Sequence, residues 1–364
     1  MTEQNSGKEG RIAWIDLLRC LAICCVVLVH SANAVYPFDL EAMTPVRLST
    51  VFAYTLLTVG RLGVPVFLMI TGYLLLDRPY DGEQTVRFWK RNLLSLLLTV
   101  EIWIVLYDLF LCWFYGEEFS LSSLLADMLF LQEVEISHFW YMPVILGIYL
   151  FLPLAATALQ HISLKTLAVP LVISGCFLFG VPTVNVFLNT LGLEPLSSQL
   201  SLDFSGGIYG ILVLIGYLFK KDAFKKIRKG WFAAALAGGL LGTIAMQVWA
   251  VSSGYLYNVW YSNPLLCLAS WGLFGLLQGE DRIRFPGAVR HLGTCSFGIY
   301  LLHVPILRIF DRYLTIPHRS LEVLVLFLLS LGISWILVEL VSRIPGAGKI
   351  LFYIRTPLRR KTKE

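Results

Sequence analysis

The chain has 364 residues, of which 57% are apolar and 15% are charged. With a mean hydropathy of +0.72, it is too apolar for a soluble globular protein of this length. The net charge of +5 is modest and falls on alternate loops, so it indicates a membrane topology and gives no support to nucleic-acid binding.

Long apolar segments follow one another from end to end of the chain. Runs of about 18 to 25 apolar residues predict membrane helices, because a helix satisfies its own backbone groups in lipid. We predict ten spans, with soft boundaries, at 12–36, 50–76, 93–115, 138–158, 166–184, 204–219, 231–252, 260–278, 294–314 and 320–342. The predicted fold class is therefore all-α, a polytopic membrane protein with one membrane domain over residues 12–342.

The first span follows a short polar head, residues 1–11, that contains Lys8 and Arg11. It has no small-residue cleavage site, so we expect an uncleaved signal anchor. The seven cysteines all fall inside apolar runs and form no CxxC pair. Buried thiols are the expected state, and we expect neither a disulfide framework nor a metal site.

Charge divides the loops into two sets. The basic set, together with the tail 343–364, contains Arg78, Arg87, Lys90, Arg91, Lys165, the cluster between Lys220 and Lys229, Arg282, Arg284 and Arg290. The opposite loops hold Arg47 and Arg319 and an acidic stretch between Glu117 and Glu135, where apolar periodicity predicts a surface helix. The positive-inside rule then places both termini, including the basic tail, in the cytoplasm.

Ionisable residues inside the spans are the first candidates for a functional site. Arg19 and His30 lie eleven residues apart in the first span, on one helical face and about 16 Å apart along it. Such residues cost several kcal/mol in a membrane, about 2.5–3.5 kcal/mol each by insertion scales, unless they pair or line a polar cavity.

Other spans carry similar residues at two depths. Arg19, Glu101 and His303 are predicted to form an inner tier, and His30, Arg61 and Asp108 an outer tier. Glu101 and Asp108 share a face of the third span because they are seven residues apart. These tiers predict a polar shaft between the first, second, third and ninth spans.

Structural roles remain open for each of these residues. Arg19 is a candidate for an ion pair with Glu101 or Asp16, and both carboxylates of the third span are candidates for pairing with buried arginines. His30 and His303 can bond another helix or a backbone carbonyl. The basic loop can serve topology alone, and Trp140 and Tyr141 can be aromatic-belt residues.

Five motifs in order resemble the acyltransferase 3 family of membrane acyltransferases. They are Arg19 followed by ten residues and His30; the stretch from Arg61 through Val64-Pro65 to Gly72-Tyr73; Phe88-Trp-Lys-Arg91; His138-Phe-Trp-Tyr141 with Tyr149 to Pro153; and Ser296 to His303. The chain is most similar to short, membrane-only members such as the one that O-acetylates enterobacterial common antigen. It departs from the family where Leu94 replaces the second arginine of R-x-x-R and Thr71 replaces a serine.

The resemblance implies an O-acyltransferase of the bacterial inner membrane. It would move an acyl group, usually acetyl, from cytoplasmic acyl-CoA to a hydroxyl of a cell-envelope glycan or lipid-linked saccharide. Acyl-CoA is then a donor substrate, and no tightly bound cofactor is expected. A transporter that uses the same ionisable residues as a relay is the alternative.

The resemblance and the chemistry together suggest a role for each candidate residue. His30 would act as a general base or carry the acyl group, with Arg19 beside the path and Asp108 orienting the imidazole. Arg87, Lys90 and Arg91 would bind the phosphates of acyl-CoA. The expected substrate-binding residues are Arg61, Trp140, Tyr141, Tyr300 and His303. Arg19, Arg61 and Tyr300 are candidates to stabilise an oxyanion.

Overall fold

The computed structural model describes residues 12–354, which form helices and loops without a strand. Within this range eight helical segments are long and apolar enough to cross a membrane. They are α1 (Ala13–Val35), α3 with α4 (Leu48–Gly60, Gly63–Leu75), α5 to α6 (Gly82–Phe88, η1 Trp89–Leu93, Leu94–Tyr115), α8 (Tyr141–Gln160), α9 to α10 (Leu164–Gly175, η2 Cys176–Gly180, Val181–Thr190), α12 (Lys229–Ser252), α14 (Pro286–Tyr313) and α15 (Arg319–Val341).

Two shorter apolar helices, α11 (Gly207–Lys220) and α13 (Pro264–Leu277), complete the bundle. Each predicted span overlaps one of these helical segments, and the predicted all-α polytopic membrane fold is confirmed. Short helices occupy the loops: α2 (Leu40–Met43), α7 (Leu121–Met128) and η3 (Asp203–Ser205). Helix α7 lies where the sequence predicts a helix in the loop after the third span.

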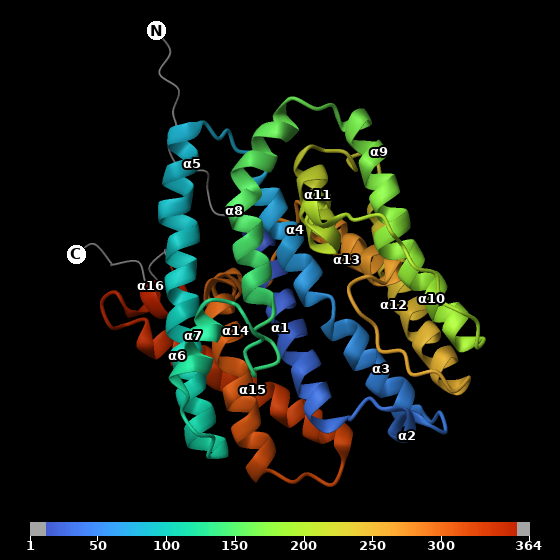
Figure 1. Cartoon of the computed structure of the whole chain (residues 1–364), viewed down its shortest axis with the longest axis vertical. Coiled ribbons are helices and arrows are strands. Elements are labelled where there is room, and N and C mark those ends of the chain that lie inside the picture. The colour runs from blue at the N-terminus through green and yellow to red at the C-terminus, as the bar shows by residue number, and fades with distance from the viewer. Residues whose placement is uncertain (1–11, 355–364) are drawn as a thin grey trace.

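Helix α1 lies in the middle of the bundle (Figure 1). It packs against α14, α3, α4 and α15, while α4 also packs on α11, and α12 packs on α13. Its residues Ile15, Leu18, Ile23 and Val27 are completely or almost completely buried. Helix α1, which carries His30, is therefore surrounded by other helices of the protein.

The second predicted span, 50–76, is broken into α3 and α4 at Arg61 and Leu62. Pro65 explains the break, because its ring nitrogen has no proton to donate to the carbonyl four residues earlier, which belongs to Arg61. Proline is tolerated in the first turn of a helix, where Pro65 stands in α4. The bend sets Arg61 at a helix end inside the bundle.

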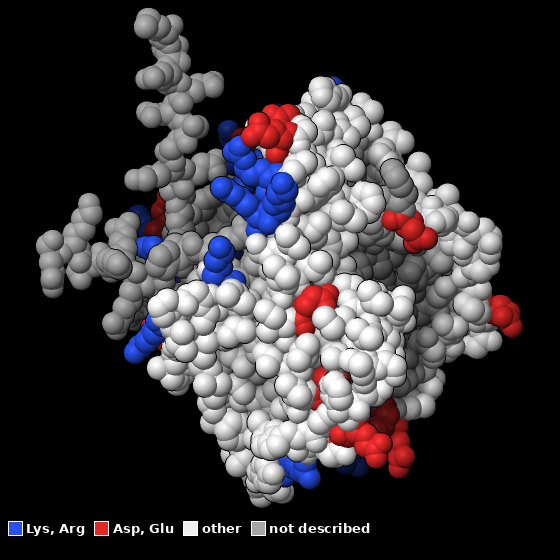
Figure 2. All heavy atoms as spheres, turned by 60° about the vertical axis from the view of Figure 1, so that its left-hand side comes forward, with Lys and Arg blue, Asp and Glu red and all other residues white. Residues whose placement is uncertain are grey.

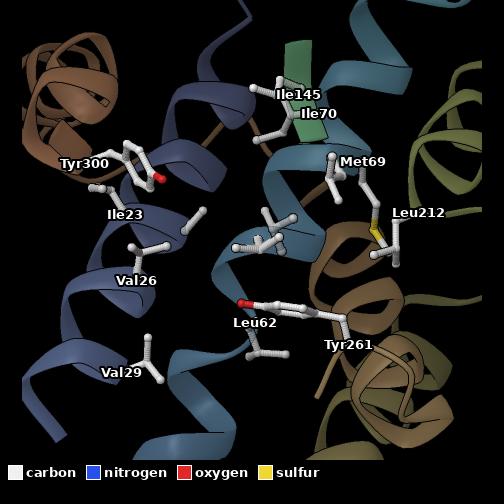
Figure 3. Close-up of a cluster of buried hydrophobic side chains, with 14 of the residues drawn as sticks. Ile23, Val26, Val29, Leu62, Met69, Ile70, Ile145, Leu212, Tyr261 and Tyr300 are labelled. Atoms are coloured by element: carbon white, nitrogen blue, oxygen red, sulfur yellow. The ribbon is translucent and has the colours of Figure 1, made fainter. Parts of the chain in front are cut away.

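Glycines allow α4 and α11 to approach closely. A Cβ added at Gly72 would overlap the carbonyl of Val213, and one at Gly216 would overlap the carbonyl of Met69. Small residues at both sides of a contact let two helix backbones touch, which is a common mode of membrane-helix packing. Figure 3 shows the apolar cluster around this contact, with Met69 of α4 and Leu212 of α11 side by side.

The first part of the predicted tail packs on the bundle. Helix α16 (Ala347–Phe352) lies on α6, where the Nε1 of Trp103 donates to the Leu351 carbonyl at 2.7 Å and the Thr99 hydroxyl donates to the Ile350 carbonyl at 2.8 Å. The predicted head, 1–11, and the last residues of the predicted tail, 355–364, lie outside the described residues.

Charged side chains are unevenly distributed on the surface. In the view of Figure 2, Lys and Arg gather mainly in the upper left part of the face, and acidic side chains cluster near its lower right edge.

Candidate active site

Three histidines from distant parts of the chain form one cluster. His30 comes from α1, His138 from the loop before α8, and His303 from α14. The ring centroids are 5.2 Å apart for His30 and His303, 5.9 Å for His30 and His138, and 4.8 Å for His138 and His303. His138 and His303 are buried, whereas His30 is half-buried.

Two tyrosine hydroxyls hold His138 in place. The Tyr107 hydroxyl lies 3.2 Å from Nε2 of His138 and donates to the Leu301 carbonyl at 2.6 Å. The Tyr300 hydroxyl donates to the backbone carbonyl of His138 at 2.6 Å. Its hydrogen is therefore already engaged and is not free for an oxyanion in this structure.

His303 bonds a backbone carbonyl, one of the roles left open for it. Its Nδ1 lies 2.6 Å from the Tyr300 carbonyl oxygen and 3.2 Å from that of Ile299. The backbone carbonyl of His303 itself accepts a bond from the Ser330 hydroxyl at 2.7 Å. The first two contacts hold the ring against α14, and the third joins the His303 backbone to α15.

The predicted depth of His303 is wrong. It lies beside His30 and therefore belongs to the outer tier, not to the inner tier with Arg19 and Glu101. The reason is the start of the helix: α14 begins at Pro286, eight residues before the predicted span at 294. Its first turns are polar, so the apolar run by itself places the helix end too late.

A cavity of ≈ 420 Å³ lies next to the histidine cluster. Its lining includes His30, Asn33, Tyr115, Glu135 and Arg308. Of the α1 residues in the lining, His30 lies deepest along the helix from its C-terminal end. The other lining residues come from the ends of α6 and α14 and from the acidic loop between α6 and α8. The cavity thus connects His30 with the side of the molecule that carries this loop.

Charged groups gather at the cavity. Arg308 donates to the Glu135 carbonyl at 3.4 Å, and its guanidinium lies 5.6 Å from the centroid of the Tyr115 ring. Desolvation raises the pKa of the Glu117 carboxyl above its ordinary value, and the nearby Glu135 raises it further. Arg308 was not among the candidates, although an arginine within a predicted span is the signal that identifies it.

Arg61 lies in an aromatic cluster. Its guanidinium is 4.3 Å from the ring centroid of Trp260 and 5.4 Å from that of Tyr261, whose hydroxyl accepts a bond from Arg61 at 3.4 Å. Trp140 packs against the rings of Tyr209, Trp260 and Tyr261 with centroid separations of 5.4–5.7 Å.

Arg61 and Trp140 were predicted from the sequence as substrate-binding residues, whereas Tyr209, Trp260 and Tyr261 were not. Their signal is weak because isolated aromatic residues are ordinary in membrane proteins. Tyr141, also selected, joins this cluster to the histidines, with its ring 6.0 Å from Trp140 and 6.1 Å from Tyr300. Figure 3 shows the Tyr300 and Tyr261 hydroxyls pointing from opposite sides toward the cluster formed by α1 and α4.

Arg19 forms an ion pair with Asp16 at 3.1 Å, one of the two partners considered for it. The carboxylate is buried, with 3% of its side chain exposed, whereas 29% of the Arg19 side chain is exposed. This ion pair lies within α1 itself. Glu101, the other candidate partner, has a buried Oε2 without a hydrogen bond.

The structure does not bring Asp108 to His30. In the part of the chain that the structure describes, the ring contacts of His30 are with His138 and His303, and no hydrogen bond joins it to Asp108. Asp108 follows Tyr107 on α6, and successive side chains of a helix point about 100° apart. Tyr107 faces the cluster, so its neighbour does not.

The three predicted donor-binding residues are exposed at the start of the α5–α6 segment. Lys90 and Arg91 lie in the π-helical turn η1, and Arg87, at the end of α5, pairs with Glu83 at 2.6 Å. Both members of that pair are well exposed, so the pair contributes at most about 1 kcal/mol and leaves Arg87 free to change partners.

Among residues 12–354, no group of His, Cys, Asp and Glu has the arrangement of a metal site. The arrangement that is present is a cluster of three imidazoles, one of which lines the cavity, and a neutral imidazole can take a proton from a hydroxyl. Arg308 lines the same cavity as His30, together with the carboxylates of Glu117, Glu135 and Asp311.

Comparison with known proteins adds one positive finding. The model of a family described as an acyltransferase domain matches residues 12–339, which is nearly the whole chain. No curated protein and no solved structure matches the chain. The matched region contains the histidine cluster, the cavity, the aromatic cluster and the basic segment.

Proposed function

Given that the chain belongs to the acyltransferase 3 family and is a membrane acyltransferase, we propose that it transfers an acetyl group from acyl-CoA to a hydroxyl of a cell-envelope glycan or lipid-linked saccharide. The observation that carries this proposal is the position of His30, which lines a polar cavity and touches two further histidines. We place the protein in a bacterial inner membrane, among the short members that O-acetylate envelope saccharides.

His30 is the general base of the proposed reaction. A neutral imidazole at the cavity takes the proton of the acceptor hydroxyl, and the oxygen then attacks the thioester carbonyl. The carbon–sulfur bond then breaks, and the CoA thiolate takes the proton from His30 and leaves as a thiol. General-base catalysis of this kind contributes typically about 10²–10⁴-fold to a rate.

The donor enters from the cytoplasmic side in this proposal. Arg87, Lys90 and Arg91 are exposed on one short segment and can bind the phosphates of CoA by charge-assisted hydrogen bonds. Arg19, on the same face of α1 as His30 and about 16 Å from it along the helix, lies beside the path of the thioester.

The acceptor enters through the cavity on the opposite side. Outside the lining of this cavity, Trp140, Tyr209 and Trp260 offer faces on which a sugar ring can stack, and Arg61 offers hydrogen-bond donors beside them. With the Tyr300 hydroxyl bonded to the His138 backbone, Arg61 is the better candidate for oxyanion stabilisation.

Replacement of His30 tests the proposed function. Membranes that contain the wild-type protein and acetyl-CoA should add the mass of one acetyl group to an envelope saccharide, as measured by mass spectrometry. His30→Ala should reduce this transfer at least about a hundredfold because the base is lost.

His161→Gln is the matched control, since His161 is exposed at the end of α8 and should leave transfer unchanged. Undiminished acetylation by His30→Ala contradicts the role of His30. A wild-type protein that moves a saccharide or an acid across the membrane without acetylating it would support the transporter alternative.

A further inference from the structure

The hydrogen bonds of the buried histidines determine which of their nitrogens carry protons. The Tyr107 hydroxyl has one hydrogen, and its 2.6 Å bond to the Leu301 carbonyl uses it. The contact of 3.2 Å between Tyr107 and Nε2 of His138 is therefore a bond that the imidazole N–H donates. In neutral His138 the other nitrogen, Nδ1, is then an unprotonated acceptor.

The same reasoning applies to His303. A carbonyl oxygen can only accept, so the 2.6 Å contact between the Tyr300 carbonyl and Nδ1 of His303 requires the proton on Nδ1. Nε2 of neutral His303 is then the unprotonated acceptor. The backbone thus sets the tautomer of one ring, and Tyr107 sets that of the other.

Both acceptor nitrogens are buried and have no hydrogen-bond partner in the described structure. Buried polar atoms without a partner are uncommon and cost about 1–3 kcal/mol each, so two in one cluster call for an explanation. The rings that carry them lie 4.8 Å apart between centroids, and His30 is their common neighbour.

We propose that Nε2 of His303 and Nδ1 of His138 form a proton-accepting pair that receives the proton that His30 removes from the acceptor hydroxyl. This inference rests on the proposed function. An imidazolium at His30 has the rings of His138 and His303 as its ring contacts, and no carboxylate is hydrogen-bonded to it in the described structure. Neutral nitrogen acceptors therefore stabilise this imidazolium. His138 and His303 provide them in place of the carboxylate predicted for this role, that of Asp108.

The proton balance of the step is complete. The hydroxyl O–H bond breaks and its proton moves to His30, while the oxygen forms a bond to the thioester carbon. The His30 proton is shared with or passed to the pair, directly or through one water molecule. When the carbon–sulfur bond breaks, the thiolate leaves with the electron pair and takes the proton back, so all three imidazoles end neutral.

Two substitutions remove the acceptor nitrogens and keep the structural bonds. The amide of glutamine can replace Nε2, so His138→Gln keeps a donor for Tyr107 and loses Nδ1. The amide of asparagine can replace Nδ1, so His303→Asn keeps a donor for the Tyr300 carbonyl and loses Nε2.

The purified protein is mixed with acetyl-CoA and with membranes from cells that lack it, and release of CoA is measured. Each variant should lower kcat at least tenfold with an unchanged KM for acetyl-CoA, because binding of the donor does not use the pair. His161→Gln again serves as the control. Thermal unfolding of each variant in detergent should match that of the wild type.

Values of kcat within twofold of the wild type for both folded variants would overturn the pair, while loss of activity in His30→Ala would leave the proposed function intact. If either variant unfolds, Tyr107→Phe gives the second test. It keeps the ring and frees the His138 tautomer, so kcat should fall severalfold, and an unchanged kcat counts against the pair. A wild-type protein that releases no CoA refutes the function itself.

Discussion

Charged side chains inside a membrane protein need partners, because an isolated charge is costly in the membrane interior. Arg61 illustrates this: its guanidinium lies 4.3 Å from the centroid of Trp260, and its partners in the described structure are aromatic rings and a tyrosine hydroxyl. A cation that is held by rings has no carboxylate to neutralise it and keeps its charge available for a bound oxygen.

Arg61→Lys tests this arrangement. Lysine keeps the charge but has no planar group to stack, so the KM for the saccharide acceptor should rise about tenfold, which corresponds to ~1.4 kcal/mol. The KM for acetyl-CoA should stay the same. Both constants are measured from CoA release, and Arg47→Lys, at an exposed position before α3, is the control. Equal acceptor KM values in all three proteins would show that Arg61 does not contact the acceptor.

Helix ends and helix contacts decide where these residues meet. The break at Arg61 follows from Pro65, and the early start of α14 at Pro286 brings His303 to the level of His30. The contact of α4 with α11 depends on Gly72 and Gly216, at which a side chain would collide with the backbone of the facing helix. Since α4 begins next to Arg61, this contact supports the site.

Gly72→Val should therefore destabilise the protein. Overpacking in a tight core costs about 1–3 kcal/mol, and a collision with backbone is at the upper end of that range or above it. The melting temperature of the purified protein should fall by several degrees. Gly238→Ala in α12, where nothing lies within 4 Å of the added carbon, should leave it unchanged or raise it slightly. Similar melting temperatures for the two variants would contradict the close contact.

At the scale of the whole molecule, the basic and acidic loops give the bundle a direction. The cluster Lys220–Lys229 and the segment with Arg87, Lys90 and Arg91 are predicted to face the cytoplasm, and the acidic loop with Glu117 and Glu135 the outside. The cavity next to His30 opens toward that acidic loop, so the proposed acceptor site and the proposed donor site lie toward opposite ends of the bundle.

Single cysteines test this orientation. A membrane-impermeant maleimide applied to intact cells should label Ser198→Cys in the exposed loop before α11. It should label Lys225→Cys, in the exposed loop after α11, only once the membrane is opened. The wild-type chain, with its native cysteines, gives the background. Labelling of Lys225→Cys in intact cells would reverse the predicted topology.

Much of this protein is determined by local sequence. Hydrophobic run length is a local property, so the all-α membrane fold, the segments that span it and the shared face of Arg19 and His30 follow without a tertiary structure. Five motifs in order were also enough to identify the family, which the match over residues 12–339 confirms. The pair of Arg19 with Asp16 is also local, because its members are three residues apart on one helix, but the sequence left Asp16 and Glu101 open as partners.

The tertiary structure alone decided the neighbours of His30. Its partners, His138 and His303, come from positions 108 and 273 residues away in the chain, and Asp108 faces elsewhere although the depth count placed it at the same level. Likewise, Arg61 meets Trp260 and Tyr261 because the loop between α12 and α13 lies against the α3–α4 bend. The face of a helix on which a residue lies follows from its own sequence. Its depth depends on where the helix begins, and its neighbours depend on how the helices pack. Apolar runs predict neither the helix start nor the packing.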